Sequence, residues 1–416
     1  MRRLEGRLQH YDWGSREEIA RILGRQADGR PWAEYWLGAH ASAPSLLTAD
    51  GHGGEVGLDE WLEHHPEELG EASRRRFGDR LAYLLKILSA AQPLSIQAHP
   101  SHEQAERGFA AENEAGIDPS SPSRIFRDDW PKPEMIVALE PFDALCGFRE
   151  PSTSLVLLSG LGPIEGLDEV LEPLRTRPAA DGLAAVLRRC LTRGEEVAPT
   201  VSRLVEAARD GLAEGRFDPE VATVATTAVD LDAAHPGDPS ILAALLMNRV
   251  RLAPGEQIHL GAGTLHAYLR GTGIEIMANS DNVLRGGLTS KHVDADALLD
   301  LAVLDPCVVQ GRGPEPTGGG DVGGVEVYRT PFPEFRLWRC TDLDEVTLPC
   351  PGSGRILLVV AGRYRLRAGE EDLALTAGEA AWLPCAECPA VSASGEGLAF
   401  LAGPGLEDDS DDEELA

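Results

Sequence analysis

Four side chains have the types that hold a divalent metal ion in proteins. Gln97 and His99 lie on a segment that alternates as a short strand, and residues two apart on a strand point to the same face. Glu134 precedes another predicted strand, and His266 follows a glycine-rich turn. Amide oxygen, carboxylate and imidazole ligands suit a borderline ion such as zinc, with room for water or substrate. Spacing alone leaves open that each histidine is an ordinary surface or core residue.

The lysines form a second group, and their scarcity is informative. The sequence has 35 arginines but three lysines, which are Lys86, Lys132 and Lys291. Arginine evidently serves wherever surface charge is enough, so the lysines indicate places that need a compact ammonium on a flexible stem. The alternative is that they survive by chance in an arginine-biased composition. Each lies in a segment that other motifs also single out, which favours the first interpretation.

The elements that must position these side chains are mixed in the first 150 residues. Apolar residues three and four apart predict helices at 17–23 and 59–91. Pro93 ends the second helix, and a change to alternating patterns follows. Strands are predicted at 94–99, 136–139 and 142–148.

The rest of the chain divides into a helical part and a β-rich part. Helical spacing recurs at 170–174, 183–191 and 201–212, and predicted strands return at 249–252, 257–260 and 273–277. Beyond a Gly- and Pro-rich loop at 312–324, short strands recur at roughly ten-residue spacing, which is typical of an all-β sandwich or barrel. The predicted fold class is mainly β with α. The predicted domains are a discontinuous β-domain at 1–150 and 246–311, a helical insert at 151–245, a C-terminal β-domain at 312–405 and a disordered acidic tail at 406–416.

Composition disfavours several classes of protein. A chain of 416 residues predicts two or three domains. The formal net charge is −30, so nucleic acid is not an expected partner. No apolar run approaches the ~18–20 residues of a membrane span, and the first residues lack the apolar stretch of a signal peptide. Seven scattered cysteines indicate reduced thiols in a cytoplasm, and the pair Cys385 and Cys388 is interpreted as structural.

Several motifs occur in an order that resembles one known family. They are YDWG at 11–14, AEYWLGAH at 33–40, LKIL at 85–88, PLSIQAHP at 93–100, KPEM at 132–135, CGF at 146–148, GTLHAYL at 263–269 and SDNVLRGGLT at 280–289. A single motif would be weak, but the ordered set is specific. The chain therefore resembles the type I mannose-6-phosphate isomerases over roughly residues 5–405, and least in the helical insert.

This resemblance implies a fold, an activity and a cofactor. The fold would be two cupin-like jelly-roll β-domains with a helical insert domain. The activity would be interconversion of mannose 6-phosphate and fructose 6-phosphate, serving GDP-mannose biosynthesis or mannose catabolism. One zinc ion per chain would be held at the positions that match the family's ligands, Gln97, His99, Glu134 and His266. Other matching active-site positions are Ser95, Lys132, Tyr268 and Arg285.

Isomerisation of an aldose to a ketose through an enediolate needs a base for the proton beside the carbonyl. Glu275, flanked by apolar residues on a predicted strand, would be partly desolvated, and its pKa would rise toward a useful value. The alternative is a strand glutamate that faces solvent, and Asp281 is the second candidate for the base. Arg285 is the best fixed cation for the developing negative charge, unless it only forms a salt bridge to Asp281.

A phosphorylated sugar also needs a local cluster of cations, because the protein as a whole is acidic. The candidates are Lys86, Lys132, Arg285 and Lys291, with Trp13, Ser95, Tyr268 and Asp281 as further active-site or substrate contacts. The expected partner is a small sugar phosphate, without nucleic acid or membrane, and a monomer is favoured.

Two other classes of protein compete with the isomerase. One is a non-catalytic cupin that senses a sugar or metal, which should have lost some active-site groups. The other is a metal-dependent cupin oxygenase, which prefers iron with histidine-rich ligands. None of the matched active-site groups is missing, and a glutamine ligand with lysine and arginine nearby fits a phosphosugar better.

Overall fold

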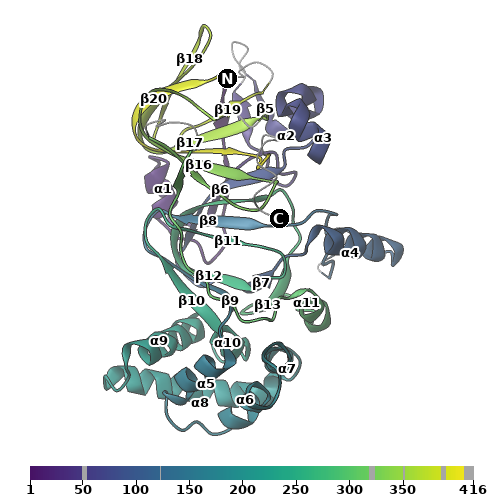
Figure 1. Cartoon of the computed structure of the whole chain (residues 1–416), viewed down its shortest axis with the longest axis vertical. Helices are drawn as coiled ribbons and strands as arrows, with labels where there is room; N and C mark the ends of the chain where they lie inside the picture. The colour runs from purple at the N-terminus through teal and green to yellow at the C-terminus, as the bar shows by residue number, and fades with distance from the viewer. Residues whose placement is uncertain (49–53, 122, 318–323, 350–351, 386–389, 407–416) are drawn as a thin grey trace.

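The computed structural model describes residues 1–48, 54–121, 123–317, 324–349, 352–385 and 390–406 (Figure 1). Along the long axis, from the top to the bottom of Figure 1, a first β-layer, a second β-layer and a group of helices follow one another. Two ten-stranded sheets confirm the predicted class, mainly β with α. The interpretation of Cys388 as structural and the predicted disorder of residues 407–416 fall outside the described residues.

The second layer, which we call the central sheet, is built around one long strand, β12 (His266–Ala278). The first half of β12 pairs with β9 and β7, and its second half pairs with β6 and β8, always antiparallel. A register shift between Tyr268 and Arg270 lies where the partners change. The other strands of this sheet are β2 (Arg7–Gln9), β3 (Glu34–Leu37), β6 (Tyr83–Ala90), β7 (Ile96–Ala98), β8 (Glu134–Ala138), β9 (Phe142–Phe148), β10 (Met247–Leu252), β11 (Gln257–Leu260) and β13 (Leu284–Gly287).

The first layer, the terminal sheet, combines both ends of the chain. Its C-terminal strands are β14 (Glu315–Pro316), β15 (Val325–Tyr328), β16 (Arg336–Thr347), β17 (Arg355–Ala368), β18 (Glu371–Thr376), β19 (Ala380–Leu383) and β20 (Ser392–Gly403). The N-terminal strands β1 (Arg2–Glu5), β4 (Leu46–Thr48) and β5 (Glu55–Gly57) continue the sheet beyond β19. The sequence did not predict this pairing, because strands of three or four residues carry too short an alternating pattern.

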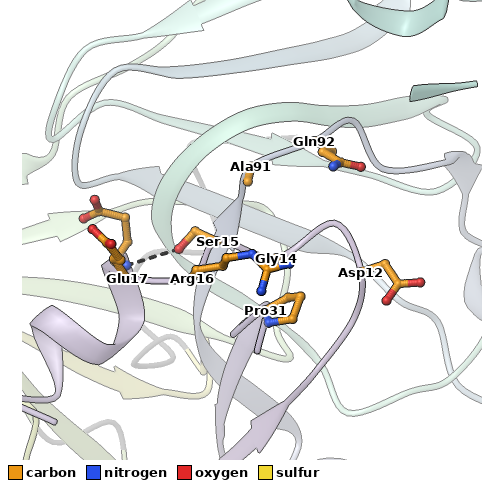
Figure 2. Close-up of a pocket in the computed structure, with 9 residues that line it drawn as sticks. Asp12, Gly14, Ser15, Arg16, Glu17, Pro31, Ala91 and Gln92 are labelled. Carbon is orange, nitrogen blue, oxygen red and sulfur yellow. Dashed lines mark hydrogen bonds between the residues drawn. The ribbon is translucent and has the colours of Figure 1, made fainter. Parts of the chain in front are cut away.

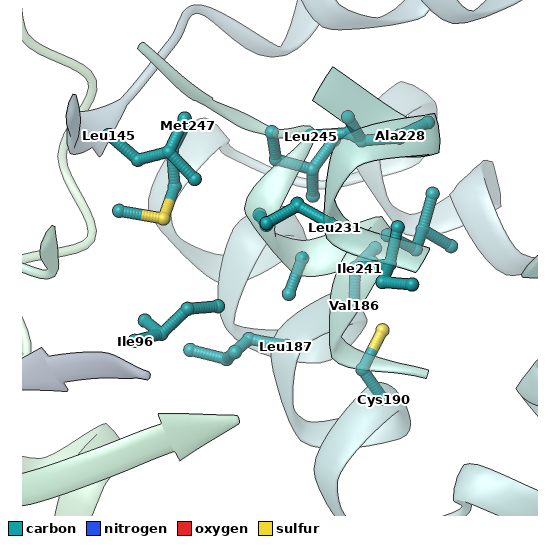
Figure 3. Packing of buried hydrophobic residues seen from close by; sticks show 14 of the residues in the cluster. Ile96, Leu145, Val186, Leu187, Cys190, Ala228, Leu231, Ile241, Leu245 and Met247 are labelled. Carbon is teal, nitrogen blue, oxygen red and sulfur yellow. The ribbon is translucent and has the colours of Figure 1, made fainter. Parts of the chain in front are cut away.

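The helices that lie between β9 and β10 in the sequence pack into one hydrophobic core, which they share with part of the central sheet. They are α5 (Pro151–Ser159), α6 (Leu167–Thr176), α7 (Ala179–Thr192), α8 (Gly194–Ala213), α9 (Pro219–Ala234) and α10 (Ser240–Ala244). Figure 3 shows their buried side chains, such as Leu187 and Leu231, meeting Ile96, Leu145 and Met247 from the central sheet. The division into domains at the boundaries given above stays a prediction. None of the described helices is long and apolar enough to cross a membrane.

The predicted helix at 59–91 is wrong in its second half. The chain forms the short helices α2 (Leu58–His64), η1 (Pro66–Leu69) and α3 (Glu71–Phe77), and then the strand β6. Every residue of β6 is buried, so its sequence is a mainly apolar run, interrupted by Lys86 and Ser89, rather than an alternation. Such a run cannot be distinguished from a buried helix by periodicity. The correction matters because it places Lys86 on a strand of the central sheet.

The other helices lie around the sheets. They are α1 (Glu18–Ile22), which was predicted, and α4 (His102–Glu114) and α11 (Ala295–Leu301), which were not. In Figure 1, α4 projects sideways from the two β-layers. It begins with a capping box in which Ser101 and Gln104 exchange hydrogen bonds, directly after the segment that carries His99.

The carboxylate of Glu68 joins three parts of the chain beside the terminal sheet. It is 1% exposed and accepts hydrogen bonds from the indoles of Trp382 (2.6 Å) and Trp61 (2.9 Å) and from Arg2 (2.8 Å). We expect Glu68→Ala to destabilise the fold by about 3 kcal/mol, because these buried donors would lose their acceptor.

The measurement is the midpoint of thermal unfolding by calorimetry. Glu71→Ala is the control, because Glu71 is an exposed glutamate whose pair with Arg75 lies at the surface. Equal midpoints for the two variants would show that the Glu68 contacts contribute nothing to stability.

Candidate active site

Three of the four predicted metal ligands converge inside the central sheet. His99 follows β7, Glu134 begins β8 and His266 begins β12, and each is at most 2% exposed. Nε2 of His99 lies 3.2 Å from Oε1 of Glu134, and Nε2 of His266 lies 3.3 Å from its Oε2. The candidate ligand atoms all lie within 4.8 Å of one another. Strand pairing therefore brings together groups that are distant in the sequence.

Backbone carbonyls hold the other nitrogen of each imidazole. Nδ1 of His99 lies 2.7 Å from the carbonyl oxygen of Asn282, and Nδ1 of His266 lies 2.9 Å from that of Thr264. A carbonyl oxygen only accepts, so each Nδ1 carries the proton and donates it. Both Nε2 atoms are left with a free lone pair, which is how a second hydrogen bond orients a metal-binding imidazole.

These atoms fit a divalent metal ion. Both Nε2 atoms and Oε2 of Glu134 are buried and have no hydrogen-bond partner among the described residues, which is costly unless a ligand such as a metal ion binds them. Burial, and then the charge of Lys132, lowers the pKa of His99 to about 4, so this imidazole is neutral at neutral pH and able to coordinate. Two imidazoles and one carboxylate also form the protein ligand set of known open zinc sites.

Two further predicted residues adjoin the cluster. Gln97 stands directly across the ladder from His266, and opposed residues share a face of the sheet. Lys132 is 7% exposed, and its Nζ lies 2.7 Å from Oε1 of Glu134. Burial by itself would raise the pKa of Glu134, but the charge of Lys132, together with the adjoining His99 and His266, outweighs burial and holds that pKa well below its ordinary value. The carboxylate therefore stays ionised.

A second buried group of charges lies on the other half of β12. Glu275 stands opposite Lys86 in the ladder with β6, and the Lys86 ammonium lies 2.8 Å from its carboxylate. The same ammonium lies 3.5 Å from Glu34, which also accepts a hydrogen bond from the indole of Trp36 at 2.7 Å. Glu34, Lys86 and Glu275 are at most 7% exposed, so the alternative of a solvent-facing Glu275 is wrong.

One ammonium cannot neutralise two buried carboxylates. Burial raises the pKa of Glu275; the charge of Lys86 opposes this shift, while Glu134 and Glu34 add to it. Burial alone would lower the pKa of Lys86, but Glu275 and Glu34 together raise it, so the ammonium form persists. Burial, and then the charge of Glu275, also raises the pKa of Tyr268 well above its ordinary value. This end of the site thus holds a carboxyl group with raised proton affinity.

The other predicted cations lie on and after β13. Arg285 is half-buried and stands opposite Gln97 in the ladder, which places it on the face that carries the metal ligands. The suggested salt bridge from Arg285 to Asp281 is wrong. Asp281 instead pairs with His40, whose Nε2 lies 3.3 Å from the carboxylate. The hydrogen bond from His40 lowers the pKa of Asp281, which makes that carboxylate a weaker base. Lys291 is exposed in the following loop.

Trp13 and Ser95 lie beside these groups rather than among them. Ser95 is half-buried and directly precedes β7. Trp13 is half-buried and stacks on Tyr11, with ring centroids 5.6 Å apart. Burial, and then the charge of Glu34, raises the pKa of Tyr11, so the Tyr11–Trp13 pair stands near the buried acids. The structure therefore places the N-terminal aromatic motif next to the Glu275 end of the site.

The sequence interpretation missed Glu34 and Asn282, although both lie within the quoted motifs. Glu34 is the acid of AEYWLGAH, and Asn282 is the amide of SDNVLRGGLT. Asn282 is fully buried and bonds the backbone of Asp128 and Trp130 through its side chain. Its carbonyl holds His99, as described above. The sequence signal that could have identified Asn282 is an amide side chain within a loop motif, because such a group must be hydrogen-bonded if it is buried.

A cavity of about 370 Å³ lies elsewhere (Figure 2). Asp12, Ser15, Arg16, Pro31 and Gln92 are among the residues that line it. None of the predicted metal ligands or cations lines this cavity. A search for the active site by the volume of this cavity alone would therefore miss the predicted metal ligands and cations.

The fold and the buried cluster define a metal-binding β-sheet protein of the cupin-like type. The family model of the phosphomannose isomerase type I catalytic domain matches residues 1–151. The mannose-6-phosphate isomerase of Salmonella typhimurium is 35% identical over 404 residues, covering 95% of this chain and 98% of the relative, and the human enzyme is 30% identical over 376 residues, covering 85% and 86%.

Solved structures agree with the sequence comparisons. A variant of the Salmonella typhimurium phosphomannose isomerase superposes with a TM-score of 0.85 at 33% identity, over 98% of this chain and 100% of that one. A mannose 6-phosphate isomerase bound with zinc and yttrium gives 0.83 at 33% identity, with the same coverage. The chain belongs to the type I phosphomannose isomerase family.

Loss of one imidazole should remove the metal. We expect His266→Ala to lower zinc affinity by more than the roughly 10- to 100-fold typical of groups that only support a ligand. The measurement is zinc per chain by mass spectrometry after gel filtration, with one ion expected for the unaltered protein. His259→Ala is the matched control, because His259 lies on β11, which pairs with β8 and not with β12, and its ring packs against Phe332. One zinc retained by His266→Ala would mean that His266 is not a ligand.

Proposed function

We propose that this protein is a zinc-dependent mannose-6-phosphate isomerase that interconverts mannose 6-phosphate and fructose 6-phosphate through an enediolate. The observation that carries the proposal is the pairing of two buried groups on one strand. Strand β12 carries both His266, which belongs to the metal cluster, and Glu275, whose carboxyl group has a raised pKa. Membership of the family supplies the substrate class.

Four residues would hold the zinc ion. His99, Glu134 and His266 supply the buried cluster, and Gln97 is the fourth ligand, on the face shared with His266. When bound, zinc supplies Lewis-acid polarisation of a substrate oxygen. The remaining chemistry falls to the side chains around it.

Glu275 acts as the proton-transfer base. The proton on C2 of the open-chain aldose passes to its carboxylate, and the released electron pair forms the C1–C2 double bond of the enediolate. The displaced electrons of the C1 carbonyl move to its oxygen, which takes up the proton of the C2 hydroxyl. The same carboxyl group then returns the carbon-bound proton to C1 as the carbonyl forms at C2. Its raised pKa suits both directions, because a base is most effective near the working pH. Asp281 is the weaker candidate, since His40 stabilises its ionised form.

The cations divide into two kinds. Lys86 and Lys132 are buried and each contacts a carboxylate, so they hold Glu275 and Glu134 in place and stabilise negative charge next to them. Arg285, opposite Gln97, stabilises the oxyanion that develops beside the metal ligands. Lys291 is exposed and is free to meet the phosphate of the substrate.

The remaining contacts complete the substrate site. Trp13 and Ser95, beside the buried groups, and Tyr268, buried on β12, are further substrate contacts, as is Asp281, which pairs with His40. The substrate is a small sugar phosphate, and we propose a cytoplasmic monomer that serves GDP-mannose biosynthesis. The raised pKa of Tyr268 keeps its hydroxyl protonated, so it can donate to a substrate oxygen.

A coupled assay for fructose 6-phosphate formed from mannose 6-phosphate tests the function directly. We expect turnover in the zinc-loaded protein and its loss after thorough chelation. Turnover that survives zinc removal would rule out the metal's role, and no turnover in the loaded protein would refute the function.

Replacing the base should lower the rate and leave the metal in place. We expect Glu275→Gln to reduce kcat roughly 10²- to 10⁴-fold, because the amide cannot accept the proton, with zinc content unchanged. Glu103→Gln is the control, since Glu103 is an exposed glutamate on α4. If Glu275→Gln turns over like the unaltered protein, the base is another group.

A further inference from the structure

Three cations near the metal cluster form no ion pair with an acidic side chain in the part of the chain that the structure describes. Arg285 and Lys291 are two of them, and Arg127, in the loop between α4 and β8, is the third. None of the ion pairs in the described ranges involves any of the three. Lys86 and Lys132, by contrast, are both paired with buried carboxylates. In a chain of net charge −30, three cations left together without a counter-ion indicate a site for an anionic ligand.

Asn282 brings the loop of Arg127 to Arg285. The amide oxygen of Asn282 accepts hydrogen bonds from the backbone N–H of Arg127 at 2.7 Å and of Asp128 at 3.3 Å. The carboxylate of Asp128 in turn accepts from the backbone N–H of Asp281 at 2.8 Å. Since Asn282 directly precedes the segment that enters β13, the clamp fixes Arg127 beside the strand that carries Arg285.

The second arginine of this loop shows the contrast. Arg124 is 4% exposed and donates to Phe126, Ile117 and Asn113, and it lies 3.1 Å from the carboxylate of Glu112. Its donors hold the loop together and tie it to the end of α4. Arg127 is exposed and no hydrogen bond from its guanidinium is found in the described part of the chain. Arg124 thus stabilises the loop, whereas the guanidinium of Arg127 is available to bind a ligand.

The three cations are close enough to affect one another. Burial, and then the charge of Arg127, lowers the pKa of Arg285. Burial, and then the charges of Arg285 and Arg127, lowers the pKa of Lys291. Like charges gathered in this way repel, and a bound dianion would relieve the repulsion. A guanidinium suits this ligand because its planar fork can donate two parallel hydrogen bonds to a phosphate.

We propose that Arg127 is a ligand of the substrate's phosphate group and forms with Arg285 and Lys291 a site that binds inorganic phosphate by itself. The proposal rests on the isomerase function for the identity of the substrate, but the phosphate site does not require turnover. Arg127 then determines specificity for phosphorylated over free sugars. Its role is binding through the phosphate and not proton transfer.

The test compares Arg127→Ala with the unaltered zinc-loaded protein in two assays. Titration calorimetry with inorganic phosphate measures the anion site directly. Steady-state kinetics with mannose 6-phosphate measure KM and kcat, with inorganic phosphate as inhibitor. We expect Kd and the inhibition constant for phosphate, and also KM, to rise about 10-fold or more, as for a lost charge-assisted hydrogen bond, with kcat changed much less.

Arg107→Ala is the matched control, because Arg107 is an exposed arginine on α4 that pairs only at the surface with Glu103. Arg127→Lys should recover part of the affinity, since it keeps the charge and loses the fork. The guanidinium of Arg127 supports no described contact, so the melting temperature and zinc content should match those of the unaltered protein.

The outcomes separate the two proposals. Phosphate binding that depends on Arg127 in a protein without isomerase activity would refute the proposed function and uphold this site. Phosphate affinity and KM that are unchanged in Arg127→Ala would overturn the site, even if isomerase activity is found. The same holds if phosphate binds equally in both proteins but only when zinc is present, because that would place the anion on the metal.

Discussion

The metal cluster and the Glu275–Lys86 pair take their positions from the register of β12. His266 stands opposite Gln97, Glu275 opposite Lys86, and Met277 opposite Glu134. A slip of one residue would turn each of these side chains to the other face of the sheet. The metal cluster and the buried acid–base pair are therefore held at a fixed separation by backbone hydrogen bonds along one strand. Side-chain contacts refine this arrangement but do not set it.

Burial of charge explains why the site has distinct parts. A buried ion is tolerated only with a partner, and Lys86 and Lys132 each have one in a carboxylate. Where buried atoms lack a partner, as at Nε2 of His99 and His266, they face the space that a metal ion fills. Cations without an ion pair among the described residues, such as Arg285 and Lys291, are only partly buried or exposed. Water can therefore solvate them until an anion binds. The presence or absence of a partner thus separates three kinds of group: lysines that support a carboxylate, side chains that can coordinate a metal ion, and cations that can bind an anion.

The first 48 residues connect the two sheets. β1 and β4 extend the terminal sheet, while β2 and β3 extend the central one, so the chain crosses between the layers several times within this stretch. Glu34, on β3, reaches the Lys86 ammonium as a result. The loop after β2 brings Tyr11 and Trp13 to the same end of the site. The same segment places Ile19, Tyr35 and Leu37 in the hydrophobic core and also supplies much of the surroundings of Glu275.

The sequence by itself determined the family, the mainly β class and the candidate ligands, because ordered motifs and residue types can be recognised without knowing which residues lie close together in space. It also singled out Lys86, Lys132, Glu275 and Arg285 as groups to explain. Only the tertiary structure decided that 83–90 is a strand, that Glu275 is buried against Lys86, and that Asp281 pairs with His40 and not with Arg285. It alone revealed Glu34 and Asn282 beside the buried groups, and the clamp by which Asn282 holds the backbone of Arg127. The physical reason is that pairing and burial are properties of strands brought together from distant segments, and no local pattern records which side chain a residue will meet across a sheet.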